Sequence, residues 1–131
     1  EAGWFRTGDL GRWDDDGYLF LVGRSKDLII SGGLNVYPAE VEAVLERHPS
    51  VVEVAVIGLP DDEWGQVVAA IVVPSAAHRP LDALGDELVE AARSELSAYK
   101  IPRRLHWTDA LPRNAMGKVD KVSLRDAFGR P

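Results

Sequence analysis

One loop near the end of the chain, Pro112-Arg-Asn-Ala-Met-Gly-Lys118, carries a lysine directly after a glycine and among polar residues. A lysine on such a loop is a point charge that can enter a closed site and stabilise oxygens shared between a carboxylate and a phosphate. The loop is not a Walker phosphate loop, because it lacks the earlier glycine and the Ser or Thr after the lysine. Taken alone, Lys118 would be an ordinary surface residue.

Two further features could bind a ligand. Asp9, in Thr7-Gly8-Asp9-Leu10, could accept hydrogen bonds from the two vicinal hydroxyls of a ribose, or it could cap a turn. The pair Gly32-Gly33 lies between an apolar run and an extended segment, where a hairpin turn with positive φ angles favours glycine. On its own, this pair indicates only a tight turn.

The apolar pattern predicts the elements that position these residues. An extended segment on each side of Gly32-Gly33 leads into a helix from Pro38 to His48, which Pro49 ends and on which Glu42 faces water. The elements predicted after it are strands over 51–58 and 66–73, a helix over about 81–98, a strand over 104–108 and a short helix over 122–128.

A strand pair within residues 3–24 precedes these elements, with strands near 4–7 and 18–22 and a turn at Asp16-Gly17. The whole order predicts an α+β fold, in which a small mixed or antiparallel sheet is covered by helices and is preceded by a β-hairpin and a hinge.

The length and composition of the chain narrow the classes of function that it can have. The chain has 131 residues, of which 46% are hydrophobic, enough for one domain with a single core. A net charge of −6 argues against a general nucleic-acid or anionic-membrane surface. We expect a soluble cytoplasmic chain without a membrane span, since there is no signal-peptide pattern and no sufficiently long apolar run. The start at Glu1-Ala2-Gly3, without methionine, suggests a fragment.

The sequence predicts no metal site. Cysteine is absent, which excludes disulfides and thiolate ligands. The three histidines, His48, His78 and His106, are scattered over a helix end, a loop and a strand, so they form no cluster with metal-ligand spacing.

Three separated motifs occur in order: Gly3-Trp-Phe-Arg-Thr-Gly-Asp-Leu-Gly11, the stretch from Val22 to Glu42 that holds Ile30-Ser-Gly-Gly-Leu-Asn-Val-Tyr-Pro38, and Pro112-Arg-Asn-Ala-Met-Gly-Lys-Val-Asp-Lys121. Together they resemble the adenylate-forming superfamily of acyl-CoA synthetases, nonribosomal adenylation domains and beetle luciferases. The resemblance runs from about Gly3 to Arg125, and the second motif is most similar to fatty-acyl and malonyl-type CoA ligases. It implies that residues 1–25 are the last strand pair of a large N-terminal domain and that residues 26–131 are the mobile C-terminal domain.

The resemblance implies roles in the adenylating state. Lys118 matches the family's catalytic lysine, which drives acyl-adenylate formation. Asp9 matches the aspartate that holds the adenylate ribose, and Arg24 its basic partner. Asn35 stands where many CoA ligases carry an arginine that contacts the nucleotide, which puts that contact in doubt. Lys26 matches the hinge position, about which the domain is expected to rotate.

In the second state, the resemblance implies a path for CoA. Gly32, Gly33 and Leu34 would line the tunnel for pantetheine, because the absence of side chains lets a thin chain pass. Arg93 matches a basic position that meets a CoA phosphate in related synthetases, or is an ordinary solvated helix residue. Trp64 could stack on the CoA adenine, or could cover the core.

The implied function is the C-terminal domain of an ATP-dependent acid–CoA ligase. Its partners would be a carboxylic acid, ATP, CoA and the large N-terminal domain of the same enzyme, with Mg²⁺ bound mainly by that domain. The isolated fragment is expected to be inactive. One alternative is an adenylation domain that loads the phosphopantetheine arm of a carrier protein. Another is a stand-alone binding module without catalysis.

Overall fold

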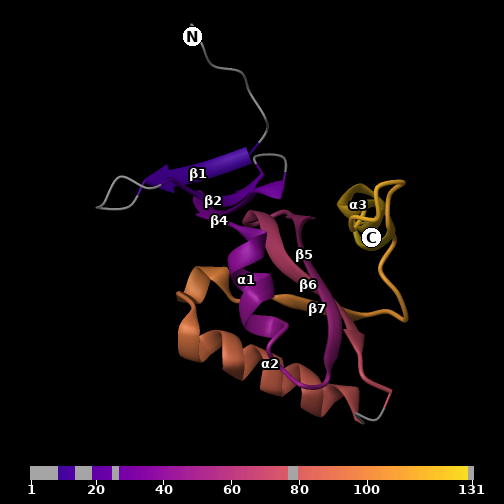
Figure 1. Ribbon diagram of the computed structural model, residues 1–131. Coiled ribbons are helices and arrows are strands. Elements are labelled where there is room, and N and C mark those ends of the chain that lie inside the picture. The colour runs from indigo at the N-terminus through magenta and orange to yellow at the C-terminus, as the bar shows by residue number, and fades with distance from the viewer. Residues whose placement is uncertain (1–8, 14–18, 25–26, 77–79, 130–131) are drawn as a thin grey trace, which may run out of the picture.

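The computed structural model describes residues 9–13, 19–24, 27–76 and 80–129, the first two ranges as backbone only. The elements are β1 (Asp9–Trp13), β2 (Leu19–Arg24), β3 (Ile29–Ser31), β4 (Leu34–Val36), α1 (Pro38–Leu45), β5 (Val51–Asp61), β6 (Gly65–Pro74), α2 (Leu81–Glu95), the 3₁₀-helix η2 (Ala98–Lys100), β7 (Arg104–Trp107) and α3 (Lys121–Phe128). Figure 1 shows how they are arranged.

The main sheet has the strand order β5-β6-β7 and is mixed, which confirms the predicted α+β class. Strands β5 and β6 form a long antiparallel pair, from Val51 opposite Pro74 to Asp61 opposite Gly65. Strand β7 runs parallel to β6, with Arg104 opposite Ala69. A parallel neighbour requires a crossover connection, and α2 lies in that connection.

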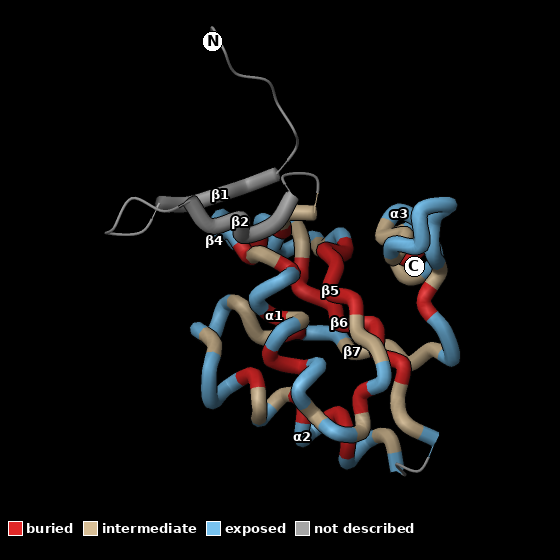
Figure 2. The backbone as a smooth tube through the Cα atoms, viewed as in Figure 1, coloured by how far each residue is buried: buried red, intermediate tan, exposed pale blue. Residues whose placement is uncertain are grey.

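Both faces of this sheet are covered, as the dense valine and alanine content of β5 and β6 predicts. Successive residues of β6 alternate between two buried clusters: Val68 and Ala70 lie in the cluster with α1 and α2, and Ala69 between them lies in the cluster with α3. Figure 2 shows the buried residues concentrated along these strands, with the exposed ones on the outer sides of the helices. The sheet, packed on both faces, is therefore the core from which the connecting loops extend.

Helices α1 and α2 both end earlier than the sequence pattern predicts. Helix α1 begins with Pro38 at its first turn and ends at Leu45, where the Glu46 amide donates to the Glu42 carbonyl at 2.9 Å. Helix α2 ends at Glu95 because Leu96 is extended, with φ −116° and ψ 151°. No helix in the described part of the chain is long and apolar enough to cross a membrane.

Strands β3 and β4 form an antiparallel hairpin with Ser31 opposite Leu34. The two turn residues, Gly32 and Gly33, both have positive φ, 58° and 83°. A two-residue turn with positive φ at both positions strongly favours glycine, so the predicted hairpin is confirmed. The Ile30 amide donates to the Gln66 side chain at 2.9 Å, which attaches the hairpin to the start of β6.

Strands β1 and β2 also pair antiparallel, with a register shift between Leu10 and Gly11. The first strand of this pair therefore lies at Asp9–Trp13, whereas the strand expected over residues 4–7 lies outside the described residues. The register places Asp9 opposite Arg24.

Candidate functional site

The loop that carries Lys118 is a tight turn closed by backbone hydrogen bonds. Arg113 and Val119 form an antiparallel bridge at its base. The Asn114 amide donates to the Lys118 carbonyl at 2.8 Å, and the Gly117 amide donates to the Asn114 carbonyl at 2.9 Å. Gly117 has φ 82°, a conformation that residues with a Cβ rarely adopt, which explains the glycine before the lysine.

Two side chains fix the turn further. Asn114 Oδ1 accepts hydrogen bonds from the amides of Met116 at 2.9 Å and Lys118 at 3.1 Å. Arg113 donates to the Gly117 carbonyl at 3.0 Å and forms an ion pair with Glu53 on β5. The backbone at Lys118 is therefore held by the domain's own contacts.

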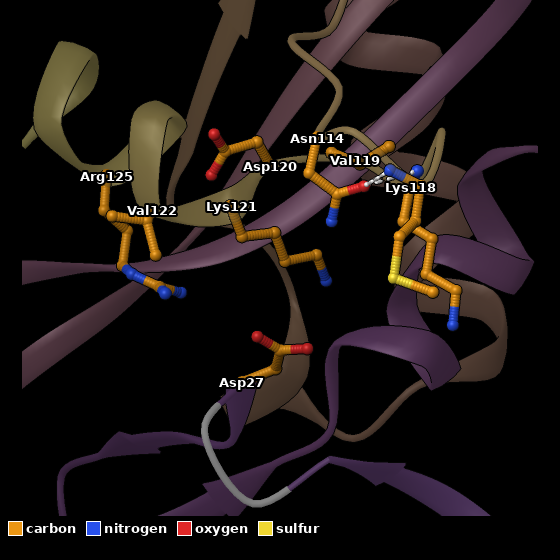
Figure 3. Close-up of a pocket in the computed structure, with 9 residues that line it drawn as sticks. Asp27, Asn114, Lys118, Val119, Asp120, Lys121, Val122 and Arg125 are labelled. Carbon is orange, nitrogen blue, oxygen red and sulfur yellow. Dashed lines mark hydrogen bonds between the residues drawn. The ribbon is translucent and has the colours of Figure 1, made fainter.

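The Lys118 side chain is exposed, and nothing in the described part of the chain forms a hydrogen bond or an ion pair with its ammonium group. It lines a cavity of about 470 Å³ beside α3. Figure 3 shows the lining residues, namely Asp27, Asn114, Met116, Lys118, Val119, Asp120, Lys121, Val122 and Arg125. A cation without a partner in the described part of the chain can meet an anionic oxygen from elsewhere.

Lys121, one of the lining residues, forms a half-buried ion pair with Glu42. Lys121 Nζ lies 3.0 Å from Glu42 Oε2, and that oxygen also accepts a hydrogen bond from the Val56 amide at 2.9 Å. The prediction that Glu42 faces water is therefore wrong, because the side chain is only 22% exposed and bridges α1, β5 and α3. Figure 3 shows Asp27 on the opposite wall, with its carboxylate turned toward Lys121.

Asp120 caps the N-terminus of α3, directly after the lysine loop. Its carboxylate accepts hydrogen bonds from the Ser123 hydroxyl at 2.7 Å and from the Ser123 amide at 3.1 Å. These two bonds lower the pKa of Asp120 below its ordinary value, because they favour the ionised carboxylate. The negative charge thus stabilises the start of α3 and lies in the wall of the Lys118 cavity.

The glycine hairpin fits closely against Trp64 in the β5–β6 turn. The Gly32 amide donates to the Trp64 carbonyl at 2.9 Å, and a Cβ on Gly32 would lie 2.7 Å from Trp64 Cε3. A Cβ on Gly33, in contrast, would have no atom within 4 Å. Gly32 is therefore required by packing as well as by φ, and Gly33 leaves open space at the tip.

Apolar and polar residues flank the hairpin tip on its exposed side. Leu34 is 49% exposed and Ile30 50% exposed. Asn35 is exposed and pairs in register with Ile30. An exposed apolar surface beside a glycine tip can contact a thin, largely apolar ligand.

Trp64 packs between the hairpin tip at Gly32 and Arg103. It is 36% exposed, and the Arg103 guanidinium stacks over its ring at 4.3 Å. Arg103 and Arg93 also line a shared hollow of about 320 Å³, and Arg93 forms an exposed 3.6 Å ion pair with Glu90. Sequence reasoning missed Arg103, although the basic pair Arg103-Arg104 after Pro102 was a visible signal.

The structure brings the predicted residues together in three places. Lys118 lies in the α3 cavity, Gly32 to Asn35 form the hairpin, and Arg93 lines the hollow with Arg103. Asp9 and Arg24 are opposite each other as backbone positions, and Lys26 and His78 lie outside the described residues. The described residues include no group of three or more His, Cys, Asp or Glu that could hold a metal ion.

Comparison with known proteins identifies the family. The sequence model of the AMP-binding enzyme C-terminal domain matches residues 40–118, which ends at the exposed lysine. The chain belongs to this family. Among solved structures, an ATP-bound RpMatB–BxBclM chimera is similar to this chain, with a TM-score of 0.88 and 44% identity over 95% of this chain and 25% of that one.

Two curated relatives illustrate the family's range. The long-chain-fatty-acid–CoA ligase FadD13 of Mycobacterium tuberculosis is 49% identical over 98% of this chain and 25% of its own length. The indoleacetate–CoA ligase of Aromatoleum aromaticum is 47% identical over 98% of this chain and 24% of its own length. The chain thus spans about a quarter of the length of the curated relatives it matches.

Proposed function

We propose that this chain is the mobile C-terminal domain of an AMP-forming acid–CoA ligase. Residues 1–25 would be the last strand pair of a large N-terminal domain, and residues 26–131 the domain that rotates. The observation that carries the proposal is Lys118, an exposed cation without a partner among the described residues, on a loop whose backbone is fixed, in a chain of this family.

In the first half-reaction, a carboxylate oxygen of the acid attacks the α-phosphorus of ATP, and pyrophosphate leaves. Negative charge is shared between the carboxylate and the α-phosphate as the new bond forms. Lys118 would enter the site and stabilise these oxygens, and the fixed loop means that little reorganisation is needed at that moment. Lys118 is the catalytic residue of this step.

The nucleotide would be held from the other end of the chain. We assign Asp9 to the ribose hydroxyls and Arg24 to the same site as its basic partner, which agrees with their opposite positions in the β1–β2 register. Asn35 is assigned to the edge of the nucleotide site, where an amide can donate and accept hydrogen bonds but carries no charge. Lys26 is assigned to the hinge.

In the second half-reaction, the CoA thiolate sulfur attacks the acyl carbon, and AMP leaves. The hairpin tip would line the pantetheine path, since Gly33 presents open space and Leu34 an exposed apolar side chain. Rotation about the hinge would replace Lys118 with the hairpin at the reaction centre.

Arg93 and Arg103 would bind the phosphates of CoA, because both line one hollow, Arg93 forms an exposed ion pair with Glu90, and Arg103 stacks over the Trp64 ring. The Trp64 ring, already covered by Arg103 on one side, extends this surface toward the hairpin. Mg²⁺ would accompany ATP and neutralise phosphate charge, bound mainly by the N-terminal domain. None of the residues assigned here is required to ligate it.

The test is a thioester assay with the full-length chain. ATP is supplied with palmitate, malonate or indoleacetate, and either free CoA or a carrier protein with its phosphopantetheine arm is the acceptor. Acyl-CoA formed with release of AMP supports the ligase. Transfer only to the carrier protein would instead support a carrier-loading adenylation domain. No adenylate and no thioester with any of these acids would favour a binding module.

A further inference from the structure

The peptide bond between Gly117 and Lys118 is held on both sides by side chains. Its carbonyl oxygen, on Gly117, accepts a hydrogen bond from Arg113 Nη1 at 3.0 Å. Its N–H, on Lys118, donates to Asn114 Oδ1 at 3.1 Å. The orientation of this peptide determines the direction in which the Lys118 side chain leaves the loop, so the two contacts determine where the ammonium group can reach.

Arg113 also connects the turn to the rigid sheet. Its second terminal nitrogen, Nη2, forms the ion pair with Glu53 on β5. The planar guanidinium therefore holds the Gly117 carbonyl with one nitrogen and the sheet with the other, a fixed fork that a lysine cannot reproduce. The pair is partly exposed, 44% at Arg113 and 34% at Glu53, and such pairs contribute little to folding.

The contacts of this arginine thus converge on the peptide that carries the catalytic lysine. We propose that Arg113, anchored by Glu53, is a positioning residue for Lys118 in adenylate formation, an inference that rests on the proposed function. It never touches the substrate. Its effect is to aim the Lys118 ammonium group, so it should matter in the half-reaction that uses Lys118 and in no other.

The chain offers a matched control. Arg47 likewise donates to a main-chain carbonyl, that of Ala43 at 3.2 Å, and forms a 2.6 Å ion pair with a carboxylate, that of Glu95. Both contacts are on α1 and α2, away from the lysine loop. Arg47→Lys therefore removes the same kind of two-contact guanidinium without changing the direction of the Lys118 side chain.

The experiment uses the full-length enzyme and the acid of the palmitate, malonate and indoleacetate panel that supports the fastest ATP–pyrophosphate exchange. Arg113→Lys, Glu53→Gln and Arg47→Lys are each measured for adenylate formation in a single turnover and for thioester formation from synthetic acyl-adenylate and CoA. Misplacement of a catalytic group by about 1 Å can slow a reaction on the order of a hundredfold. We expect Arg113→Lys to slow adenylation roughly 10- to 100-fold and Glu53→Gln to slow it less, with thioester formation unchanged for both.

A double-mutant cycle separates positioning from a general structural effect. If Arg113 acts through Lys118, adding Arg113→Lys to Lys118→Ala should change the residual adenylation rate by less than about twofold, the range expected when a shared target is already lost. A purely structural role would slow the Lys118→Ala enzyme by the same factor as the wild type.

The outcomes distinguish the inference from the proposed function. If Lys118→Ala abolishes adenylation but Arg113→Lys behaves like Arg47→Lys, the positioning role is wrong and the catalytic role of Lys118 stands. Equal loss in both half-reactions, or additive effects in the cycle, would also overturn the positioning role. If Lys118→Ala leaves adenylation intact, the proposed function and this inference both fail.

If Arg113→Lys does not fold, Glu53→Gln provides the same comparison, because it loosens Arg113 while leaving every loop residue in place.

Discussion

A Cβ atom on Gly32 would lie 2.7 Å from Cε3 of Trp64, so the hairpin tip and the β5–β6 turn fit together only if residue 32 has no side chain. The contact joins two segments that are far apart in the sequence, and the Gly32 amide donates to the Trp64 carbonyl at the same point. Packing therefore requires glycine at position 32, whereas the space beside Gly33 is open.

We predict that Gly32→Ala destabilises the domain more than Gly33→Ala does. Both substitutions place a Cβ at a positive φ, which costs about 1 kcal/mol. Only Gly32→Ala also displaces Trp64, and overpacking of this kind typically costs about 1–3 kcal/mol more. Urea denaturation of both variants would measure the difference in the free energy of unfolding, and equal losses would contradict the packing described for Gly32.

Gly33→Leu should obstruct pantetheine while leaving adenylation usable. The tip has open space for the new side chain in the domain itself, so the obstruction arises only when CoA must pass. Gly33→Ala is the control, because it has the same backbone strain with little bulk. Wild-type thioester formation by a folded Gly33→Leu enzyme would show that the hairpin does not line the path.

Glu42→Ala should lower the free energy of unfolding by about 1–3 kcal/mol, because both the Val56 amide and the Lys121 ammonium lose their partner in a half-buried place. The control is Glu46→Ala, which removes an exposed carboxylate just after the same helix and should have an effect within about 0.5 kcal/mol. Thermal or urea denaturation provides the measurement. Similar effects at the two positions would rule out the bridging role of Glu42.

His106 should make the free energy of unfolding depend on pH. Acidification through the ordinary pKa range of histidine should lower that free energy. Burial, and then the nearby charge of Arg104, lower the pKa of His106 from its ordinary value of 6.5, and its ring packs 4.8 Å from that of Phe128 on α3. The unfolded chain then binds this proton at a higher pH than the folded chain. The contribution of His106 to the free energy of unfolding is fully present above pH 6.5. It is lost as the pH falls from there toward the lowered pKa of His106 in the folded chain.

His106→Gln should remove this part of the pH dependence. Free energies of unfolding at several pH values between 7.5 and 5 would test it, and an unchanged slope in the variant would refute the assignment to His106. Asp120 also has a lowered pKa, so its stabilisation is likewise lost on acidification; it is present above the ordinary carboxyl range and is lost at still lower pH than that of His106.

Local pattern was sufficient to predict the fold class, the element order and the glycine hairpin. Pro38 marked a helix start, and Gly32-Gly33 marked a turn with positive φ, because these residues restrict or free the backbone directly. The helix ends were less predictable. Leu96 continues the apolar stripe of α2 but is extended, since the chain turns there into η2 and β7.

Contacts between distant segments could not be predicted from local pattern. Glu42 occupies a polar position on α1, and only its contacts with Val56 and Lys121 make it a half-buried bridge. The stacking of Arg103 on Trp64 likewise joins a turn to a segment beyond α2. Lys118 was predicted from its motif, whereas the Arg113–Glu53 anchor of its loop depends on how β5 lies beside that loop.

The most direct test of the central claim is Lys118→Ala in the full-length enzyme, with each half-reaction measured separately. Removal of a preorganised charge from a closed site slows reactions on the order of a hundredfold to a thousandfold, so adenylate formation should fall by that factor. Thioester formation from synthetic acyl-adenylate and CoA should stay near the wild-type rate, because the lysine loop is expected to have left the reaction centre. A parallel fall in both half-reactions, or adenylation at the wild-type rate, would contradict the assignment of Lys118 and the two-state function proposed for this domain.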